Sequence, residues 1–463
     1  MSQSEILIKN ISAIVSCDPE DRVYRDVDLC IEDNQIKQIA QGIQAPGARV
    51  IDGSRKFVYP GMVNTHHHFF QTFVRNLIKV DYVNIGVMDW LDVIYRIFPY
   101  VNDEVIYYSS LSAMADLIKH GCTTAFDHQY CNPKPGAEYI DRQMDAAELL
   151  GIRYHAGRGA NSISQKYGSP IPDAMVETAD EFLGDCERLI EKYHDPNPFS
   201  MRQIVVAPCQ PVNMYESDYI ESIRFAREHG VRLHTHLGEG ETEIMLARYN
   251  RRTLDWCGHI GFLGEDVWFA HGWELLPEEY SVLAQSGSGL AHCPGPAVLG
   301  GYPIIDIAAM QRAGMTVGLG CDGSATNDGS SMLDTLRMGY LMQAYFAKTR
   351  GGCVTPYQML KCATVEGAKI LGRDDIGSLS EGKAADLFMI DLDALELCGT
   401  GHDPMNLLAR VGVVGNVWLT MINGKIVWEN GRFPGIDEQE LSRKGEEVHK
   451  RVIRGRFEGL FNA

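Results

Sequence analysis

Residues 231–236, VRLHTH, and residues 266–271, DVWFAH, decide how the chain is expected to fold. Each is a short, almost continuously apolar run that ends in a histidine, and a helix-like segment separates the two. Apolar strands that alternate with helices are typical of a parallel sheet buried on both faces. The two runs therefore predict a parallel α/β fold if the same unit recurs along the chain.

The unit recurs from about residue 60 to residue 322. Helix-like segments such as 104–121 and 219–230 end in glycine, as helices commonly do. Eight strand-like runs favour a closed (β/α)₈ TIM barrel over an open sheet. They are the run before His66 and residues 123–127, 153–159, 204–208, 231–236, 266–271, 287–292 and 316–322.

Seven of these runs finish with a polar side chain. In a barrel, the carboxyl ends of all strands lie at one face, and that face holds the active site. The pattern therefore predicts that residues spread along about 250 positions meet in one ring. They are His68, Asp127, Arg158, His236, His271, His292 and Asp322.

Both ends of the chain have a different residue pattern, with short β-type runs and tight turns such as Asn423-Gly424. Two distant β-rich ends can meet as one small sheet domain. We expect a β-sandwich domain from residues 1–59 and 375–435, beside a barrel over residues 60–374. Residues 436–463 have mixed charge and helical spacing, which predict a C-terminal helical tail on the surface or against a neighbouring subunit.

The composition excludes several classes of partner. The chain of 463 residues carries a formal charge of −19, and such a surface repels nucleic acid. Residues 1–10 lack the features of a secretory signal, and no apolar run is long enough to predict a membrane span. Twelve scattered cysteines without a Cys-x-x-Cys pair predict reduced, mostly buried thiols in a cytoplasmic protein, and no cysteine zinc site.

The stretch NTHHHFFQTF, residues 64–73, follows the first barrel run. Side chains alternate across a strand, so His66 and His68 face one way and His67 the other. Alone, the pair is better explained as a polar strand end. With His236 and Asp322 at other strand tips it predicts ligands for one divalent cation, Zn²⁺ or alternatively Fe²⁺.

Such an ion lowers the pKa of its water toward ~7, so that metal-bound hydroxide can attack a substrate at neutral pH. Asp322 is the candidate acceptor of the water proton. Glu239, three residues after His236, is the candidate donor to the substrate, although its acidic surroundings also fit a surface loop. His271 either ligates the ion or hydrogen-bonds the hydroxide, and the pattern leaves both roles open.

Four motifs resemble the amidohydrolase superfamily, in particular its cytosine and guanine deaminase-like and chlorohydrolase-like branch, which includes triazine aminohydrolases and 8-oxoguanine deaminases. They are PGMVNTHHH (60–68), HTHLGE (234–239), FAH (269–271) and GLGCDGSATNDG (318–329). The resemblance covers essentially the whole chain. It implies one metal held by His66, His68, His236 and Asp322, with Glu239 and His271 as proton shuttles.

The resemblance also bears on metal number and assembly. Relatives with two metals often bridge them through a carbamylated lysine near IVVAPCQP, residues 204–211, and that stretch has no lysine. One metal is therefore implied. Oligomers are common among such enzymes, so a homodimer or larger homo-oligomer is expected.

The implied reaction is hydrolytic removal of ammonia or an alkylamine from a ring carbon of a small N-heteroaromatic substrate. That substrate is a hydroxyatrazine-like aminotriazine, or an aminopurine, pterin or pyrimidine. Gln71 resembles the glutamine that binds a ring edge in guanine deaminase-like enzymes, and a surface glutamine is the alternative. Trp90 can stack on a flat ring, although core packing is common for such residues. His292, Arg158 and His128 are further candidates for substrate contacts.

Other activities remain open at this point. One is a nucleobase deaminase of the 8-oxoguanine, guanine or isocytosine type. Another is a cyclic-amide hydrolase resembling imidazolonepropionase, which forms an acid without release of an amine. A non-catalytic scaffold on the same fold is not expected, because scaffolds of this kind have lost metal ligands that this chain retains.

Overall fold

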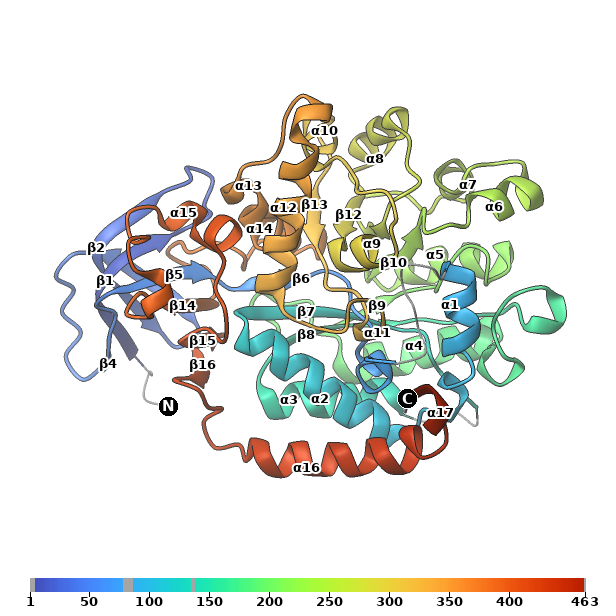
Figure 1. Ribbon diagram of the computed structural model, residues 1–463, viewed down its shortest axis with the longest axis horizontal. Helices are drawn as coiled ribbons and strands as arrows, with labels where there is room; N and C mark the ends of the chain where they lie inside the picture. Colours follow the sequence, from blue (N-terminus) through green and yellow to red (C-terminus); the bar gives the residue numbers. More distant parts are fainter. Residues whose placement is uncertain (1–4, 78–85, 135–137, 462–463) are drawn as a thin grey trace.

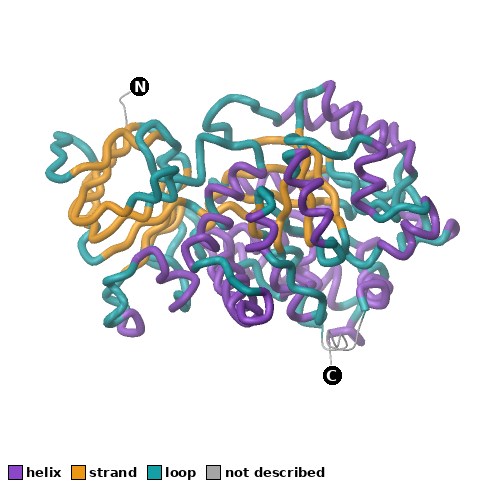
Figure 2. Tube along the Cα trace, turned by 90° about the horizontal axis from the view of Figure 1, so that it is seen from above, coloured by secondary structure: helices purple, strands orange, loops and turns teal. Residues whose placement is uncertain are grey.

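The computed structural model describes residues 5–77, 86–134 and 138–461. A sheet of strands from both chain ends lies beside a larger part in which helices surround a barrel (Figures 1 and 2). This arrangement confirms the predicted (β/α)₈ TIM barrel and the small β domain built from both chain ends.

The barrel is closed by eight strands, with β6 paired to β13 at the seam. Their pairings are parallel, and each predicted run contributes one strand. All eight residues of β7 are buried, as expected for a strand covered on both faces. The strands are β6 (Met62–Asn64), β7 (Cys122–Gln129), β8 (Arg153–Arg158), β9 (Arg202–Val206), β10 (Arg232–Leu237), β11 (Val267–His271), β12 (Gly289–His292) and β13 (Val317–Leu319).

The second sheet joins the two chain ends in the order β16-β15-β14-β5-β1-β2-β3, and β4 pairs with β1. The predicted turn at Asn423-Gly424 lies between β15 and β16, which pair antiparallel. The exact domain boundaries stay predictions. The strands are β1 (Glu5–Val15), β2 (Val23–Glu32), β3 (Gln35–Ala40), β4 (Arg49–Asp52), β5 (Lys56–Pro60), β14 (Leu387–Asp391), β15 (Leu419–Ile422) and β16 (Lys425–Glu429).

Helices follow the barrel strands and cover their outer faces (Figure 1). In α2, the Asn102 side chain accepts the Val105 N–H and satisfies a free donor of the first turn. The predicted helices at 104–121 and 219–230 correspond to α2 and α5. The helices up to β11 are η1 (Phe69–Val74), α1 (Val87–Ile94), η2 (Phe98–Tyr100), α2 (Asp103–Lys119), α3 (Tyr139–Leu150), η3 (Gln165–Tyr167), η4 (Asp173–Met175), α4 (Ala179–Tyr193), α5 (Glu216–Glu228), α6 (Thr242–Tyr249) and α7 (Thr253–Ile260).

The helices after β11 complete the ring around the barrel and form the tail. In the tail, Gly445 packs against Phe73 and Tyr108, so α16 lies on helices of its own chain. These helices are η5 (Pro277–Glu279), α8 (Tyr280–Ser286), α9 (Pro294–Leu299), α10 (Ile307–Arg312), α11 (Ser324–Asn327), α12 (Met332–Arg350), α13 (Pro356–Cys362), α14 (Val365–Ile370), η6 (Leu395–Leu397), α15 (Pro404–Asn406), η7 (Leu407–Val411), α16 (Glu438–Val448), η8 (His449–Arg454) and α17 (Glu458–Phe461).

None of the twelve cysteines forms a disulfide, and ten of them are buried. The prediction of reduced, mostly buried thiols is therefore confirmed. Over the described residues, every helix is too short or too polar to cross a bilayer.

A buried ion pair connects the barrel to the β domain. The Arg153 guanidinium donates to both carboxylate oxygens of Asp386, at 3.0 Å from Nη2, and the two side chains are 0% and 1% exposed. The same carboxylate accepts the Asn423 N–H at 2.6 Å. Arg153 begins β8, whereas Asp386 precedes β14, so one carboxylate joins both parts of the fold.

We predict that Asp386→Ala destabilises the protein by about 3–5 kcal/mol, because it leaves the buried Arg153 charge without its partner. The measurement is the urea unfolding midpoint. The matched control is Asp393→Ala, which removes an ion pair with Arg55 whose side chains are 61% and 62% exposed. Since exposed pairs contribute little, the control should keep nearly the wild-type midpoint. Equal midpoints for both variants would show that the buried pair does not hold the two parts together.

Candidate active site and metal centre

The barrel seam brings the first and last strands of the site together. Thr65 donates its N–H and its hydroxyl to the Leu319 carbonyl, at 3.0 and 2.8 Å. Directly beyond this contact, the Asp322 N–H donates to the His66 carbonyl at 3.0 Å. Two residues separated by more than 250 positions are therefore neighbours at the carboxyl end of the barrel.

Backbone carbonyls fix the orientation of two predicted ligands. His68 Nδ1 lies 2.9 Å from the His128 carbonyl, and His236 Nδ1 lies 2.6 Å from the Cys209 carbonyl. A carbonyl only accepts, so Nδ1 carries the proton in both rings. Each Nε2 then presents a lone pair to the centre of the site.

His66 is oriented by a second histidine instead of a carbonyl. His234 Nδ1 lies 3.0 Å from the Trp268 carbonyl and therefore donates to it, which leaves His234 Nε2 as an acceptor. His66 Nδ1 lies 3.0 Å from that Nε2 and donates to it. His66 Nε2 consequently carries a lone pair, and it is buried without a hydrogen-bond partner among the described residues.

These lone pairs face one another at short range. His68 Nε2 lies 3.2 Å from His236 Nε2, and Asp322 Oδ1 lies 3.3 and 3.4 Å from Nε2 of His68 and His66. With Nδ1 protonated in each neutral ring, no proton is left to separate these acceptors, so a cation between them relieves the repulsion. Three imidazoles and one carboxylate also match the ligands that zinc prefers. The residues therefore fit a divalent cation.

Glu239 and His271 lie beside this cluster. His271 Nε2 is 3.4 Å from Glu239 Oε1. A ring nitrogen of His271, a ring nitrogen of His236 and a carboxylate oxygen of Glu239 all lie within 4.8 Å of one another. Burial raises the pKa of the Glu239 carboxyl well above its usual range, and the Asp322 charge raises it further. Burial lowers the pKa of His271 to about 4. Burial thus favours the protonated form of the Glu239 carboxyl and the neutral form of the His271 imidazole next to the candidate ligands.

Asp322 remains ionised in the same surroundings. Burial opposes its charge, but His271 and His68 together hold the pKa of this carboxyl below its ordinary value. Its Oδ1 accepts the Gly323 N–H at 2.7 Å, and its Oδ2 accepts the Thr326 hydroxyl at 3.2 Å. The pKa values of the two carboxyl groups are therefore shifted in opposite directions, as an acid and a base require.

A profile of the amidohydrolase family matches residues 57–427. The chain belongs to the amidohydrolase family. The match spans the whole barrel and, in the second sheet, β14, β15 and most of β5 and β16, and it includes every candidate ligand described above.

Named relatives agree with this assignment. The chain is 48% identical to hydroxydechloroatrazine ethylaminohydrolase of Pseudomonas sp. strain ADP, over 96% of this chain and 94% of the relative. It is 38% identical to 8-oxoguanine deaminase of Pseudomonas aeruginosa, over 92% and 95%. The crystal structure of atrazine chlorohydrolase from Arthrobacter aurescens TC1 complexed with zinc superposes with a TM-score of 0.92, at 28% identity over 96% of this chain and all of that one. These matches confirm a hydrolase acting on C–N bonds other than peptide bonds.

Aromatic side chains line the pocket of this amidohydrolase above the ligands. Trp90, Trp273 and Tyr302 line it together with Glu239 and Asp322. The Trp273 and Tyr302 rings stack with centroids 4.5 Å apart and planes 11° from parallel. The pocket is therefore suited to a flat, largely apolar ligand next to the proton-carrying groups.

Gln71 lies in the adjoining part of the pocket with His68 and His236. Its Nε2 donates to the Tyr130 hydroxyl at 3.3 Å, and its buried Oε1 has no partner among the described residues. A Cβ at position 323 would lie 1.8 Å from that oxygen, so only glycine leaves room for the Gln71 amide there. The amide is thus held in the pocket with one acceptor free.

The remaining predicted substrate contacts lie in different surroundings. His292 is fully buried with neither ring nitrogen bonded among the described residues, and burial lowers its pKa to about 3. His128 stacks on His236 at 4.9 Å, and its Nε2 donates to the Ala207 carbonyl at 2.7 Å. His128 therefore supports the ligand layer from behind.

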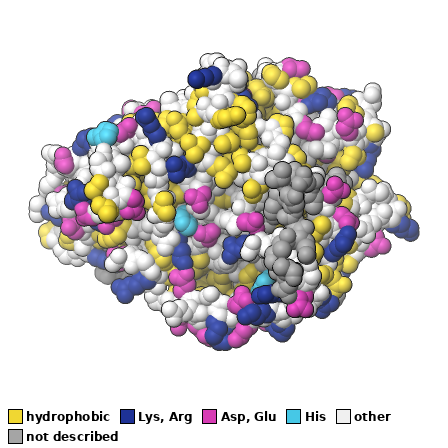
Figure 3. Space-filling view, in the orientation of Figure 1, with side chains coloured by type: hydrophobic (Ala, Val, Ile, Leu, Met, Phe, Trp, Pro, Cys, Tyr) yellow, Lys and Arg dark blue, Asp and Glu magenta, His cyan; other side chains and the backbone are white. Residues whose placement is uncertain are grey.

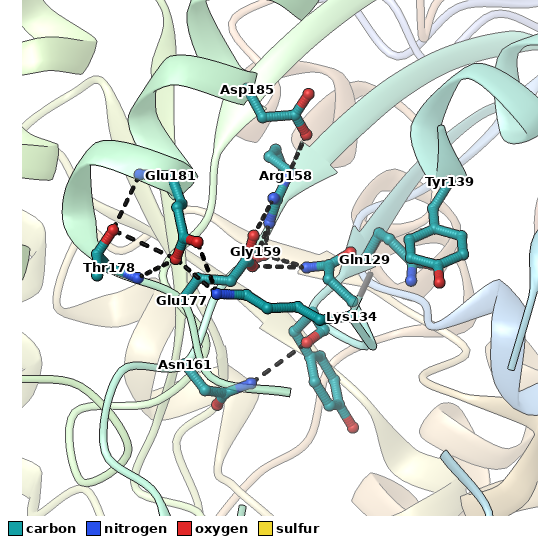
Figure 4. Close-up of polar contacts among 12 residues, drawn as sticks. Gln129, Lys134, Tyr139, Arg158, Gly159, Asn161, Glu177, Thr178, Glu181 and Asp185 are labelled. Atoms are coloured by element: carbon teal, nitrogen blue, oxygen red, sulfur yellow. Dashed lines mark hydrogen bonds and ion pairs between the residues drawn. The ribbon is translucent and has the colours of Figure 1, made fainter. Parts of the chain in front are cut away.

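The structure does not bring Arg158 to the pocket. Its guanidinium forms ion pairs with Glu177 at 2.6 Å and with Asp185 at 2.7 Å, and Figure 4 shows these contacts at the end of β8. It also donates to the Gly159 carbonyl at 2.5 Å. These contacts hold the segment after β8, where Glu177 precedes α4, in place.

Sequence reasoning missed two features of the site. His234 shares a strand face with His236, and the same alternation that paired His66 with His68 could have indicated it. Trp273 and Tyr302 come from loops after β11 and before α10, and no local pattern predicts that they stack. Only the tertiary structure brings those two rings together.

Two residues of the candidate site have a strained backbone conformation. His271 has φ 75° and Asp322 has φ 63°, in the left-handed region that residues other than glycine seldom adopt. His271 is the last residue of β11, and Asp322 lies three residues after β13, so both stand where the chain leaves the barrel. Such outliers concentrate at functional sites because the surrounding structure holds them there.

We predict that His234→Phe lowers zinc affinity about 10- to 100-fold, because His66 loses the acceptor that fixes its ring orientation. Affinity would be measured by competition with a chromogenic chelator. His234→Gln, which can still accept from His66, should recover part of the loss. The control is His155→Phe on β8, a buried histidine outside the cluster that should leave affinity unchanged. If both phenylalanine variants bound zinc like the wild type, His234 would not position His66.

Proposed function

We propose that the protein is a metal-dependent aminohydrolase that removes an alkylamine or ammonia from a ring carbon of an N-heteroaromatic substrate. The observation that carries the proposal is the convergence of three imidazoles and Asp322 at an aromatic pocket that Glu239 lines, with His271 beside Glu239. The 48% identity to hydroxydechloroatrazine ethylaminohydrolase supports a hydroxyatrazine-like aminotriazine as the substrate.

One divalent cation would be held by His66, His68, His236 and Asp322. We propose Zn²⁺, with Fe²⁺ as the alternative, because imidazole and carboxylate ligands suit both and a related structure is described with zinc. When bound, such an ion lowers the pKa of a water toward ~7 and supplies hydroxide at neutral pH.

The protein side chains move the protons of the reaction. The ionised Asp322 accepts the proton of the attacking water at its carboxylate. Glu239, whose pKa burial raises, gives its proton to the ring nitrogen beside the attacked carbon. His271, 3.4 Å from Glu239, holds the attacking oxygen in place through its ring nitrogen. Asp322 then gives the water proton to the amine, the C–N bond breaks and the amine leaves as a neutral molecule, while Glu239 regains a proton from the newly added hydroxyl group.

The pocket would orient the ring for this attack. The free Oε1 of Gln71 accepts a ring N–H, and its Nε2 faces Tyr130. Trp90 and the stacked Trp273–Tyr302 pair cover the apolar parts of the substrate. His292 and His128 complete the buried polar layer below the ring.

The binding partner, the location and the assembly of the enzyme belong to the same proposal. The partner is a small N-heterocyclic molecule, and neither nucleic acid nor membrane takes part. We propose a cytoplasmic enzyme that assembles as a homodimer or a larger homo-oligomer.

The proposal is tested by an amine-release assay on protein of measured metal content. The panel contains 2-hydroxy-4,6-bis(alkylamino)triazine, guanine, 8-oxoguanine, isocytosine and pterins, and the products followed are ammonia and alkylamine. We expect alkylamine from the triazine, because apolar side chains such as Val87, Trp90 and Trp273 line much of the pocket. Release of no amine from any substrate by the metal-loaded protein would contradict the proposal and favour the cyclic-amide hydrolase.

A nucleobase deaminase is the second candidate. The 38% identity to 8-oxoguanine deaminase over 92% of the chain favours it. In the same assay it would release ammonia from a purine or pterin and nothing from the dialkylated triazine. The two candidates share the residues of the mechanism and differ in the pocket.

We predict that Glu239→Gln lowers kcat about 100- to 10,000-fold, because the amide cannot donate the proton. The raised pKa of Glu239 means that the wild-type rate falls as pH rises through that pKa, where the carboxyl loses its proton. The variant should lack this fall, which a pH–rate profile measures. The control is Glu243→Gln at the exposed start of α6. A profile identical to the wild type would remove Glu239 from the mechanism.

A further inference from the structure

Helix α12 has an inner face that packs on the barrel and an outer face that is apolar. The inner face buries Leu333, Leu336 and Gly339. On the outer face Leu341 is 42% exposed and Tyr345 is 76% exposed. Large apolar side chains this exposed occur singly on most protein surfaces, but here they follow one another at helical spacing on one face.

Charged residues bracket this apolar face in a regular way. Asp334, Leu341 and Lys348 are all exposed and lie seven residues apart, so they align along one stripe of the helix. Arg337 is exposed four residues before Leu341, and Tyr345 four residues after it. The stripe therefore has opposite charges at its two ends and an apolar centre.

This order makes the stripe complementary to itself. When two copies of α12 lie antiparallel across a two-fold axis at Leu341, Asp334 of one copy faces Lys348 of the other, twice. The same axis places Arg337 under the Tyr345 ring of the second copy, a favourable cation–π arrangement. A parallel pairing would instead put like charges side by side.

Neighbouring surface extends the stripe. The segment after η7 packs against α12, since a Cβ at Gly412 would lie 2.7 Å from the Arg337 side chain. Val411, the last residue of η7, is 41% exposed, and Val414 in the segment after it is 82% exposed. Figure 3 shows hydrophobic side chains gathered on the upper part of the face that carries α12 in Figure 1. A stable interface covers about 800 Å² on each partner, more than one helix supplies, and these valines add to it.

We propose that the α12 face binds the same face of a second copy of this chain, antiparallel and centred on Leu341. The binding partner is a second copy of the chain, because in an antiparallel pair the acidic end of each α12 stripe meets the basic end of the other. The interface lies on the outside of the barrel and uses none of the residues of the proposed reaction. Its test is therefore independent of the substrate and of the metal.

The test is the oligomeric state of the full-length protein by sedimentation velocity over a range of concentrations. Asp334→Lys and Lys348→Asp should each raise the dimer dissociation constant about ten-fold or more, because each places two like-charge pairs across the axis. The double variant Asp334→Lys/Lys348→Asp restores opposite charges and should return the constant close to the wild-type value. Recovery of this kind is specific to an antiparallel α12 contact.

Two further variants separate the interface from folding. Tyr345→Ala should raise the dissociation constant at least as much as the charge reversals, since buried tyrosines contribute strongly to interfaces. Tyr167→Ala removes a comparably exposed aromatic, 63% exposed on η3, and should leave the dimer unchanged. Circular dichroism melting should be the same for all variants at concentrations where they are monomeric. A monomeric wild type at high micromolar concentration, or a dimer that ignores these charges, would overturn the proposal.

Discussion

Closure of the barrel between β6 and β13 is the constraint on which the site depends. The two strands have only three residues each, and one backbone register, Asn64 opposite Leu319, joins them. Side chains reinforce the seam: the Asn64 amide oxygen accepts the Cys321 N–H at 2.9 Å, and Thr65 donates twice to Leu319. Because the candidate ligands His66 and Asp322 lie only two and three residues beyond these strands, a shift of one residue here would turn His66 and His68 out of the site.

The histidines form two layers with different tasks. An inner layer of Nε2 atoms meets Asp322, while an outer layer of carbonyls and His234 fixes the tautomer of each ring. The inner layer alone is electrostatically unfavourable, since acceptors face acceptors at 3.2–3.4 Å. Binding free energy of a cation would therefore be coupled to the stability of the barrel's carboxyl end.

The sequence predicted the parts of the structure that have local signals. Apolar runs that alternate with helix-like segments predicted the eight barrel strands. The polar residues at the ends of those runs predicted the cluster of His66, His68, His236, His271 and Asp322. It failed where a side chain's partner is distant. Arg158 ends a strand as the ligands do, yet Glu177 and Asp185 from the following segment hold it away from the pocket. The stacking of Trp273 on Tyr302 depends on how two loops fold back, which neither loop encodes alone.

The left-handed backbone at His271 and Asp322 has a consequence for how this protein can change. At both positions glycine would remove about 1–3 kcal/mol of conformational strain, so the most favourable backbone and the required side chain exclude each other. The candidate site therefore carries a conformational cost at two positions where the proposed chemistry needs a side chain.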